Sequence, residues 1–370
     1  MKKISVVTAA RSEYGLLKWL MHDIMESSDL ELQLIVTGGH LLSEQGHTID
    51  EIMEDGFEIS YIVDAKLDTS TQANIAFGMG KMAQGFAEAF EKLQPDLVVV
   101  LGDRYELLPV CNTAFVMRIP IAHISGGDVT EGAIDDGIRN AITMLADYHF
   151  PGTKDAAENI IRMRGSDKHV WVVGEPGLDS FIRENLMSRE ELAEDLDLNV
   201  DKKWILMTYH AETKKSIEYN LDVVKNCVQC LLGQENIQVV ATYANADFGG
   251  NEINQYLTEC AKAYSKIIKV IPSLGQRRYL SFMKQAALVL GNSSSGITEA
   301  PFLNVPVVNV GDRQKGRHQC ENIIQSEANK EGIENAIDYS LHVIINNAED
   351  RLYWGNGHTS EQITVKLINI

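Results

Sequence analysis

Short runs of β-branched and other apolar residues alternate with longer segments of helical periodicity, and this alternation is the feature that most constrains the fold of the chain. A series of strand–helix–strand units folds as a parallel, doubly wound sheet with helices on both faces. In the first half, the pattern predicts strands at residues 4–8, 32–37, 97–101, 119–123 and 170–173. It predicts helices at residues 14–25, 72–93, 106–116 and 137–146.

The alternation starts again after Gly174-Glu175-Pro176-Gly177, where glycine and proline cluster. This second series predicts strands at residues 204–208, 238–242, 267–271, 288–290 and 305–310, with helices at 217–232, 252–265, 278–285 and 298–302. We therefore expect an α/β protein of two Rossmann-like, doubly wound domains, residues 1–174 and 175–370, that face each other across a cleft. Residues 354–370 are expected to form a closing helix that packs back on the first domain.

Charge and cysteine content narrow the class of protein. The formal net charge of the 370 residues is −19, which disfavours nucleic acid and anionic membrane as partners. The apolar run 4–10 ends at Arg11 and is too short for a signal peptide or a membrane helix, so we expect a cytoplasmic protein. The five cysteines are irregularly spaced, and Cys227 and Cys230 fit helix packing better than redox or metal chemistry.

Polar motifs follow the predicted strands of the first half, where an open α/β sheet binds its ligands. Residues 8–15 read TAARSEYG and open a helix whose amides, with Arg11, suit a phosphate. Asp103, in GDRYE, is either a helix N-cap or a cleft carboxylate. The block HISGGDVTEGAIDDGIR, residues 123–139, gathers four carboxylates at a strand end. They indicate either an acidic surface loop with a helix cap at Asp135 or Asp136, or paired groups for general acid–base catalysis.

The second half carries signs of an anion site. His210 ends a strand in TYHAET, and GNSSSG at residues 291–296 runs directly into a helix, a combination of hydroxyls and free amides that suits a diphosphate. Glu299 lies in the first turn of that helix and suits ribose hydroxyls. Three cations follow in GDRQKGR, residues 311–317, in an otherwise acidic protein. The Walker lysine motif and a GxGxxG after the first strand are both missing, so ATPase and NAD-dependent activities are disfavoured.

Taken in chain order, ARSEYG, LGDRYE, the HISGGD to DDGIR block, TYHAET, GNSSSG and GDRQKGR resemble the hydrolysing UDP-N-acetylglucosamine 2-epimerases of sialic acid biosynthesis. These enzymes are kin of the non-hydrolysing bacterial epimerases, which have the glycosyltransferase-B fold. The resemblance implies removal of the carbon-2 proton with loss of UDP, which gives a 2-acetamidoglucal, and then addition of water to release N-acetylmannosamine. It implies a nucleotide-sugar substrate and a homodimer or homotetramer. No cluster of metal ligands is visible in the sequence, and arginines and helix ends can neutralise a diphosphate, so we expect no cofactor or metal, with assistance by magnesium as the open alternative.

The resemblance also implies roles for individual residues. The UDP part is expected to contact Arg11, His210, Asn245, Ser293, Ser294, Glu299 and Arg313, with Ser294 and Arg313 near the phosphates. The hexosamine is expected to contact Glu13, Asp103, Arg104 and Asp135. Asp103 and Asp135 are the acid and base candidates, in either order. His210 is expected to neutralise or protonate the departing diphosphate.

Ser125 departs from the pattern, because many relatives have HIEGGE and place a glutamate at this position. Either Asp128 or Glu131 takes over its task, or the sugar site differs. Since enzymes of the legionaminic pathway resemble the chain in lacking this acid, a 2,4-diacetamido sugar nucleotide is an alternative substrate. Two further alternatives are a glycosyltransferase of the same fold and a non-catalytic nucleotide-sugar sensor.

Overall fold

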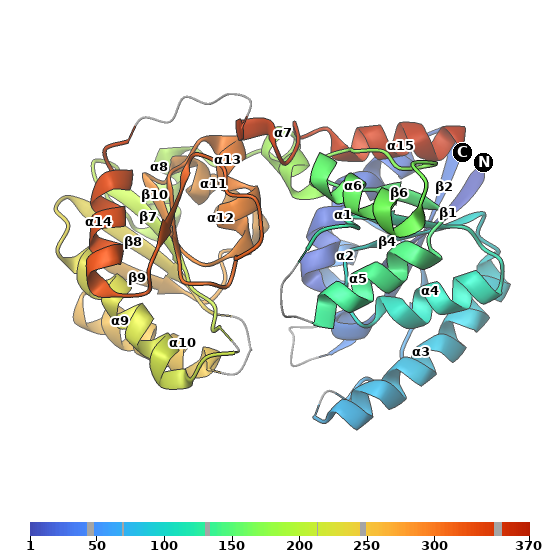
Figure 1. Ribbon diagram of the computed structural model, residues 1–370, viewed down its shortest axis with the longest axis horizontal. Coiled ribbons are helices and arrows are strands. Elements are labelled where there is room, and N and C mark those ends of the chain that lie inside the picture. The colour runs from blue at the N-terminus through green and yellow to red at the C-terminus, as the bar shows by residue number, and fades with distance from the viewer. Residues whose placement is uncertain (43–47, 69, 130–133, 213, 245–248, 344–349) are drawn as a thin grey trace. The chain divides into compact units, whose positions relative to one another are not determined.

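A computed structural model describes the chain from Met1 to Ile370 except for residues 43–47, 69, 130–133, 213, 245–248 and 344–349. Two compact units are present, Met1–Ser180 with Gly355–Ile370, and Phe181–Trp354. Each unit contains one parallel sheet flanked by helices (Figure 1). The sequence suggested a division after residue 174, and the structure divides the chain between Ser180 and Phe181. The C-terminal segment lies in the first unit.

The first sheet has six strands within the described residues, and all of its pairs are parallel. Their spatial order is β3 (Ile59–Val63), β2 (Leu30–Thr37), β1 (Lys2–Thr8), β4 (Leu97–Leu101), β5 (Ile121–Ile124) and β6 (Tyr148–Phe150). This order reverses between β1 and β4, which is the topological switch point of a doubly wound sheet. The loops after β1 and β4 therefore lie at the crevice where such sheets bind ligands.

The helices of the first unit bury their apolar faces on both sides of this sheet. They are α1 (Arg11–Glu26), α2 (Ile49–Glu54), α3 (Gln72–Leu93), α4 (Leu107–Val116), α5 (Ile134–Leu145) and α6 (Lys154–Arg164), with 3-10 turns η1 (Gly38–Leu41) and η3 (Pro176–Leu178). Leu17, Leu20, Met21 and Ile24 recur at helical spacing in α1 and pack on β1 and β2 in one core cluster. Thr153 caps α6 by accepting the Ala156 N–H at 3.1 Å.

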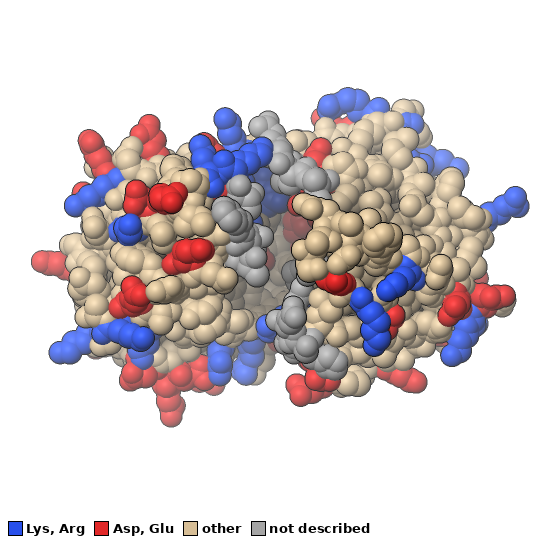
Figure 2. Space-filling view, turned by 90° about the horizontal axis from the view of Figure 1, so that it is seen from below, with Lys and Arg blue, Asp and Glu red and all other residues tan. Residues whose placement is uncertain are grey.

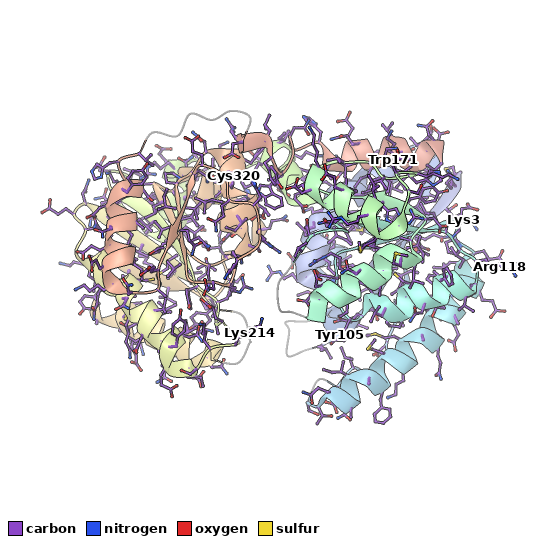
Figure 3. All side chains as sticks on the ribbon, in the orientation of Figure 1. Lys3, Tyr105, Arg118, Trp171, Lys214 and Cys320 are labelled. Atoms are coloured by element: carbon purple, nitrogen blue, oxygen red, sulfur yellow. The ribbon has the colours of Figure 1, made fainter. Side chains whose placement is uncertain are left out.

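The C-terminal helix α15 (Thr359–Asn369) belongs to this first unit. It packs against α1, and its Ile363 and Leu367 join the core cluster that contains β1 and β2. The buried carboxylate of Asp179 accepts the N–H groups of Thr359 at 2.8 Å and Ser360 at 2.6 Å, which caps the first turn. On the neighbouring surface, the ring of Trp171 lies under the Lys366 ammonium at 5.3 Å (Figure 3).

The second sheet also has six described strands, all parallel to their neighbours. Their order is β12 (Ile323–Ser326), β11 (Val307–Val310), β10 (Leu288–Gly291), β7 (Lys203–Thr208), β8 (Ile237–Thr242) and β9 (Ile268–Ile271). Counted from β7, this is the strand order of the first sheet. The expectation of two doubly wound sheets is therefore confirmed, and the second switch point lies between β7 and β10.

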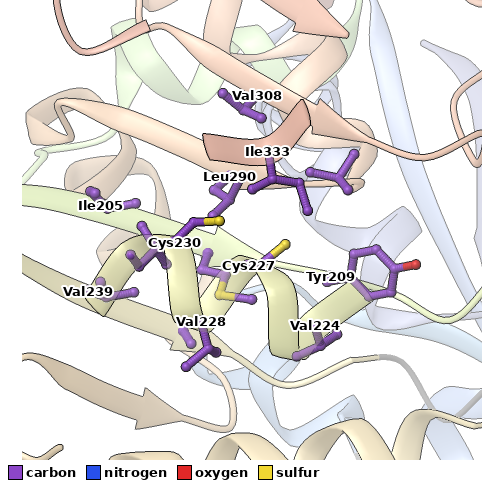
Figure 4. Packing of buried hydrophobic residues seen from close by; sticks show 14 of the residues in the cluster. Ile205, Tyr209, Val224, Cys227, Val228, Cys230, Val239, Leu290, Val308 and Ile333 are labelled. Atoms are coloured by element: carbon purple, nitrogen blue, oxygen red, sulfur yellow. The ribbon is translucent and has the colours of Figure 1, made fainter. Parts of the chain in front are cut away.

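The helices of the second unit are α8 (Arg189–Leu196), α9 (Ile217–Leu232), α10 (Gly250–Ala263), α11 (Gly275–Gln285), α12 (Ser294–Thr298), α13 (Ala300–Leu303) and α14 (Lys330–Ser340), with η4 (Asp350–Leu352). The short helix α7 (Asp179–Arg183) spans the division between the units. Cys227 and Cys230 lie in α9 inside a core cluster with Ile205, Val239 and Leu290 (Figure 4). Burial raises the pKa of both thiols, so these cysteines are packing residues.

Three strands and one segment differ from the sequence expectation. The strands β3, β6 and β12 were not predicted, and they are short or lie at sheet edges, where the apolar signal is weak. The predicted strand at 170–173 is wrong, since only Val170 forms a β-bridge, with His149. The carbonyl of Val173 instead accepts hydrogen bonds from Thr359 at 3.0 Å and Gln362 at 3.2 Å, so α15 takes the place of a neighbouring strand.

Acidic and basic side chains are interspersed over both units on the face shown in Figure 2, so the net charge of −19 is not gathered into one patch there. Among the described helices, none is both long enough and apolar enough to span a membrane.

Candidate active site

Several of the residues singled out in the sequence lie at the two switch points. In the first unit, Arg11 and Glu13 follow β1, and Asp103 and Arg104 follow β4, its partner in the sheet. In the second unit, His210 follows β7, and the Ser293 turn follows β10. A Cβ at Gly291 would lie 2.0 Å from the Thr208 carbonyl oxygen, so only glycine lets β10 and β7 end this close together.

Glu13 is buried beneath the end of β1. Its carboxyl Oε2 accepts the Ala9 N–H at 2.8 Å, while Oε1 is buried and has no hydrogen-bond partner among the described residues. The pKa of Glu13 is raised to about 8, chiefly by burial. The Ala9 N–H and Arg104 oppose this shift, and the charge of Glu106 adds to it. Glu13 is therefore mostly protonated at neutral pH. In that state it adds no charge to the site and can donate a hydrogen bond.

Arg104 forms a bidentate pair with Glu106 just after β4. Its Nη2 lies 2.8 Å and its Nε 3.2 Å from the two carboxylate oxygens. The Glu106 side chain is 1% exposed, whereas the Arg104 side chain is 36% exposed. The guanidinium therefore pairs with a buried carboxylate and remains partly accessible to solvent. Arg11, at the start of α1, pairs with Glu51 at 3.0 Å and is half exposed. Two arginines thus border this switch point.

Arg139 of α5 contacts both the loop after β4 and the acidic block after β5. Its guanidinium is almost completely buried, forms an ion pair with Asp103, and donates to the Asp128 carbonyl at 2.7 Å. The carboxylate of Asp136 lies 3.4 Å from the same guanidinium. A residue of α5 therefore joins the loop after β4 to the loop after β5. This pairing also decides the open question about Asp103, whose carboxylate contacts a cation and is no helix N-cap, since the N-cap position of α4 is Glu106.

The turn after β5 has a shape that only its glycines allow. Gly127 has φ +84°, and a Cβ there would lie 2.2 Å from the Ala156 carbonyl oxygen. His123 donates from Nε2 to the Gly102 carbonyl at 2.8 Å, and its Nδ1 accepts from Thr143 at 3.2 Å. Burial lowers the pKa of His123 to about 4, so its imidazole is a neutral brace between β5 and β4.

The remaining candidates of the first unit are placed as follows. Asp128 is half-buried in the loop after β5, and Asp135 is half-buried in the first turn of α5. Glu131 lies outside the described residues, as does Asn245 of the second unit. Asp128 therefore follows β5, and Asp135 lies at the start of α5.

In the second unit, the Asn292 side chain joins the loop after β10 to the loop after β7 through two hydrogen bonds. Its side chain accepts the His210 N–H at 2.7 Å and donates to the His210 carbonyl at 2.9 Å. Its own carbonyl accepts from Arg313 at 3.0 Å and from Gln314 at 2.8 Å. Burial, and then the nearby Arg313, lower the pKa of His210 to about 4. His210 is therefore a neutral imidazole at pH 7, placed beside a fixed cation.

The serine turn after β10 is rich in hydroxyl groups. Ser293 precedes α12, and its Oγ lies 3.0 Å from that of Ser295, which in turn lies 2.5 Å from the Tyr279 hydroxyl. Ser294 is exposed at the first residue of the helix. Glu299 is half-buried at the end of α12, and burial raises its pKa to about 7. Such a carboxyl can both donate to and accept from vicinal hydroxyls.

Several residues of the site had no role assigned from the sequence. Asn292 and Arg139 stand inside the quoted motifs, but nothing in their spacing showed which loops they join. Glu212 also lies in a quoted motif, and its carboxylate accepts the Asp312 N–H at 3.2 Å. A Cβ at Gly311 would lie 2.2 Å from Glu212 Oε1, so the loop that carries Arg313 packs directly on this acid.

One group of possible metal ligands occurs among the described residues, formed by His318, Cys320 and Asp350. Its members are engaged with one another. His318 contacts the Asp350 carboxylate at 3.3 Å, and the Cys320 thiol donates to the Asp350 carbonyl at 3.4 Å. Burial raises the pKa of Cys320 to about 12, so the free thiol is protonated at neutral pH.

The two Rossmann-like sheets, each with its ligand crevice at a switch point, define an α/β protein of the glycosyltransferase-B type. The solved structure of the UDP-N-acetylglucosamine 2-epimerase of Methanocaldococcus jannaschii, in complex with UDP-GlcNAc and UDP, matches all of both chains with a TM-score of 0.81 at 21% identity. The model of the UDP-N-acetylglucosamine 2-epimerase family matches residues 22–368. The chain belongs to this family and is an epimerase.

Two curated relatives narrow the comparison. The GDP/UDP-N,N'-diacetylbacillosamine 2-epimerase (hydrolysing) of Campylobacter jejuni is 38% identical over 328 residues, which cover 89% of this chain and 85% of the relative. The UDP-N-acetylglucosamine 2-epimerase of Neisseria meningitidis is 30% identical over 371 residues, which cover 100% of this chain and 95% of the relative.

Proposed function

We propose that the protein is a hydrolysing 2-epimerase of a UDP-linked 2-acetamido sugar. It removes the proton from carbon 2, expels UDP to leave a 2-acetamidoglucal, and adds water to give the free sugar of mannose configuration. The observation that carries the proposal is the pairing of Asp103 with buried Arg139 beside the acidic loop after β5, in a chain of the epimerase family. The relative with 38% identity is named as hydrolysing, which favours release of the free sugar.

The second unit holds the nucleotide in this proposal. Arg313, fixed by the Asn292 carbonyl, and the exposed Ser294 at the start of α12 supply a cation and a hydroxyl for the diphosphate. Ser293 supports the same turn, and Glu299 receives the ribose hydroxyls. Because His210 is neutral at pH 7, it acts as a hydrogen-bond donor to the departing diphosphate, and protonation follows only when the phosphate charge raises its pKa.

The first unit acts on the sugar. Asp103 and Asp135 serve as acid and base, in an order that the proposal leaves open, while Arg104 and protonated Glu13 contact the ring substituents. Arg11 approaches the diphosphate by leaving its exposed pair with Glu51, which costs little because such pairs contribute only about 0–1 kcal/mol. The cytoplasmic location, the homodimer or homotetramer, and the meeting of both half-sites across one cleft remain predictions.

For the sugar itself we propose a 2,4-diacetamido-2,4,6-trideoxyhexose as the preferred substrate, with N-acetylglucosamine as the second candidate. Support comes from the relative at 38% identity, which is named for N,N'-diacetylbacillosamine, against 30% for the relative named for UDP-N-acetylglucosamine. Ser125 agrees with this choice, since the sequence resemblance places a glutamate there in many enzymes of the N-acetylglucosamine type.

The test is incubation of the purified protein with each UDP-sugar in deuterium oxide, with products followed by mass spectrometry and NMR. We expect UDP and a free mannose-configured sugar that carries one deuterium at carbon 2, formed faster from the diacetamido substrate. Unchanged substrate together with tight UDP binding would point to a sensor. Release of UDP only in the presence of an acceptor would point to a glycosyltransferase.

Two substitutions separate chemistry from nucleotide binding. Asp103→Asn should abolish turnover and leave UDP affinity within a few-fold, because the lost carboxylate faces the sugar. Arg313→Ala should weaken UDP binding by about 1.5–3 kcal/mol, the range for a charge-assisted hydrogen bond. Calorimetry measures the affinities, and formation of the free sugar measures turnover. Normal turnover by Asp103→Asn would show that the catalytic assignment is wrong.

A further inference from the structure

Glu175 is a carboxylate near the carboxyl ends of β5 and β6, and the sequence showed it only as part of the Gly-Pro joint between the two series of strands. Its Oε2 accepts a hydrogen bond from the Ser125 hydroxyl at 3.3 Å, and Ser125 is the first residue after β5. A Cβ at Gly152, in the loop after β6, would lie 1.8 Å from Glu175 Oε1. The missing side chain at position 152 therefore leaves the space that the carboxylate occupies.

The backbone holds Glu175 in this direction. Glu175 is the N-cap residue of η3, where Pro176 restricts the chain, and its carbonyl accepts the Leu178 N–H at 3.1 Å. Gly174, with φ +91°, packs against Gly355, where a Cβ would lie 2.8 Å from the Gly174 Cα. A solvated surface acid would need none of these constraints. The side chain is thus positioned by the fold.

Glu175 contacts the turn that begins the acidic block of residues 123–139. Ser125 begins the sequence Ser125-Gly126-Gly127-Asp128, and the Asp128 carbonyl is held by Arg139, which also holds Asp103. Ser125 has φ +56°, a left-handed conformation that is uncommon for serine, and its N–H donates to the Phe150 carbonyl at 3.0 Å. The hydroxyl is therefore turned toward Glu175 by a strained but fixed backbone.

The proposed reaction contains three proton transfers, and a separate group for each would spare any of them from changing its protonation state between elimination and hydration. Inversion at carbon 2 requires that a proton leave one face of the ring and that another arrive on the opposite face, which a single side chain cannot do. Addition of water at carbon 1 also requires a base. Asp103 and Asp135 supply two of these three groups, so one place is open for a third carboxylate.

We propose that Glu175 is the base that removes the carbon-2 proton, an inference that rests on the proposed function. Glu175 Oε2 forms an O–H bond as the carbon–hydrogen bond breaks, and the released electron pair forms the double bond between carbons 1 and 2. The bond from carbon 1 to the diphosphate oxygen breaks, and UDP leaves with its electron pair. Glu175 then returns its proton to water. Asp103 and Asp135 carry out the hydration step, one protonating carbon 2 and the other deprotonating water.

The test compares Glu175→Gln with Ser125→Ala and with Glu158→Gln, an exposed charge-matched control on α6. Glutamine keeps the size and still accepts the Ser125 hydrogen bond, but it is not basic. We expect Glu175→Gln to lower UDP release by about 100-fold or more, the range for loss of a general base. Its hydration of added 2-acetamidoglucal and its UDP affinity should stay within about threefold. Ser125→Ala should lose less than about tenfold, and Glu158→Gln should match the parent.

Three results would overturn the proposal. These are UDP release by Glu175→Gln within tenfold of the parent, an equal loss in Ser125→Ala, and accumulation of the glucal while UDP release continues. Thermal unfolding and UDP binding establish that the variant folds. If it does not, Glu175→Asp, which withdraws the carboxylate by one methylene, should show the same selective loss of elimination. An inactive parent protein would refute the proposed function, whereas an active parent with an active Glu175→Gln refutes only the role of Glu175.

Discussion

Burial sets the charge of the polar side chains at the strand ends. Glu13, His123 and His210 would all be read from the sequence as groups with ordinary titration behaviour. In the fold, burial raises the pKa of Glu13 to about 8 and lowers the pKa of both histidines to about 4. The site therefore contains a neutral acid and neutral imidazoles at pH 7, and its fixed positive charge comes from arginines.

Replacement of Glu13 by glutamine tests whether the buried carboxyl is protonated, through the pH dependence of the free energy of unfolding. The folded-state pKa of about 8 lies above the ordinary value of 4.5, so the stabilisation from the bound proton is present below pH 4.5 and is lost as the pH rises through 8. Glutamine cannot ionise, so the free energy of unfolding of Glu13→Gln should gain on that of the parent between pH 5 and pH 8.5. Urea unfolding at several pH values measures the difference. A difference that stays constant with pH would contradict the assignment.

At the scale of elements, the turn after β5 fixes several contacts of the candidate site in the first unit. It has to bring Ser125 to Glu175 and Asp128 to Arg139 within four residues, and it does so through a glycine in the left-handed region. A strand end and a helix start are thereby joined at an angle that other residues do not allow.

Two glycines near this turn form a matched pair. Gly127→Ala should destabilise the protein by about 1–3 kcal/mol, because the positive φ strains alanine and its Cβ meets the Ala156 carbonyl. Gly137→Ala, on the exposed face of α5 where a Cβ meets nothing, should stabilise it by up to about 1 kcal/mol. Chemical denaturation measures both. Equal effects of the two substitutions would show that this turn does not depend on its glycine.

For the whole molecule, the C-terminal helix α15 is the element that links the two ends of the chain. It lies farthest along the chain from β1 and yet completes the core of the unit that β1 begins, with Leu367 fully buried against α1 and Lys2 donating to the Leu367 carbonyl at 2.9 Å. The stability of the first unit therefore depends on residues at both ends of the chain.

Leu367→Ala should lower the stability of the first unit by about 2–5 kcal/mol, the usual cost of a cavity at a buried leucine. Val365→Ala, at a half-exposed position of the same helix, should change it by less than about 0.5 kcal/mol. Hydrogen exchange should show faster opening of β1 and α1 in Leu367→Ala and unchanged protection of β7 and β8. Equal loosening of both sheets would contradict the assignment of α15 to the first unit.

The prediction from sequence was most accurate where the signal is local. The interior strands of both sheets were found because four or five consecutive apolar residues, such as Leu97 to Leu101, have few other structures open to them. The edge strands β3, β6 and β12 were missed, and residues 170–173 were mistaken for a strand, because their environment is set by distant partners. The motif residues of the site lie at the strand ends, as expected.

The sequence by itself determined the α/β class, the succession of two doubly wound sheets and the loops that carry the site, because periodicity and turn residues act over a few positions. Only the tertiary structure decided that Asp103 pairs with Arg139, that Glu13 is protonated, and that Glu175 lies beside Ser125. These contacts join residues that are distant along the chain, and the charges follow from burial. The spacing of residues along one strand or helix does not show which distant side chain a residue contacts, nor how far the fold excludes water from it.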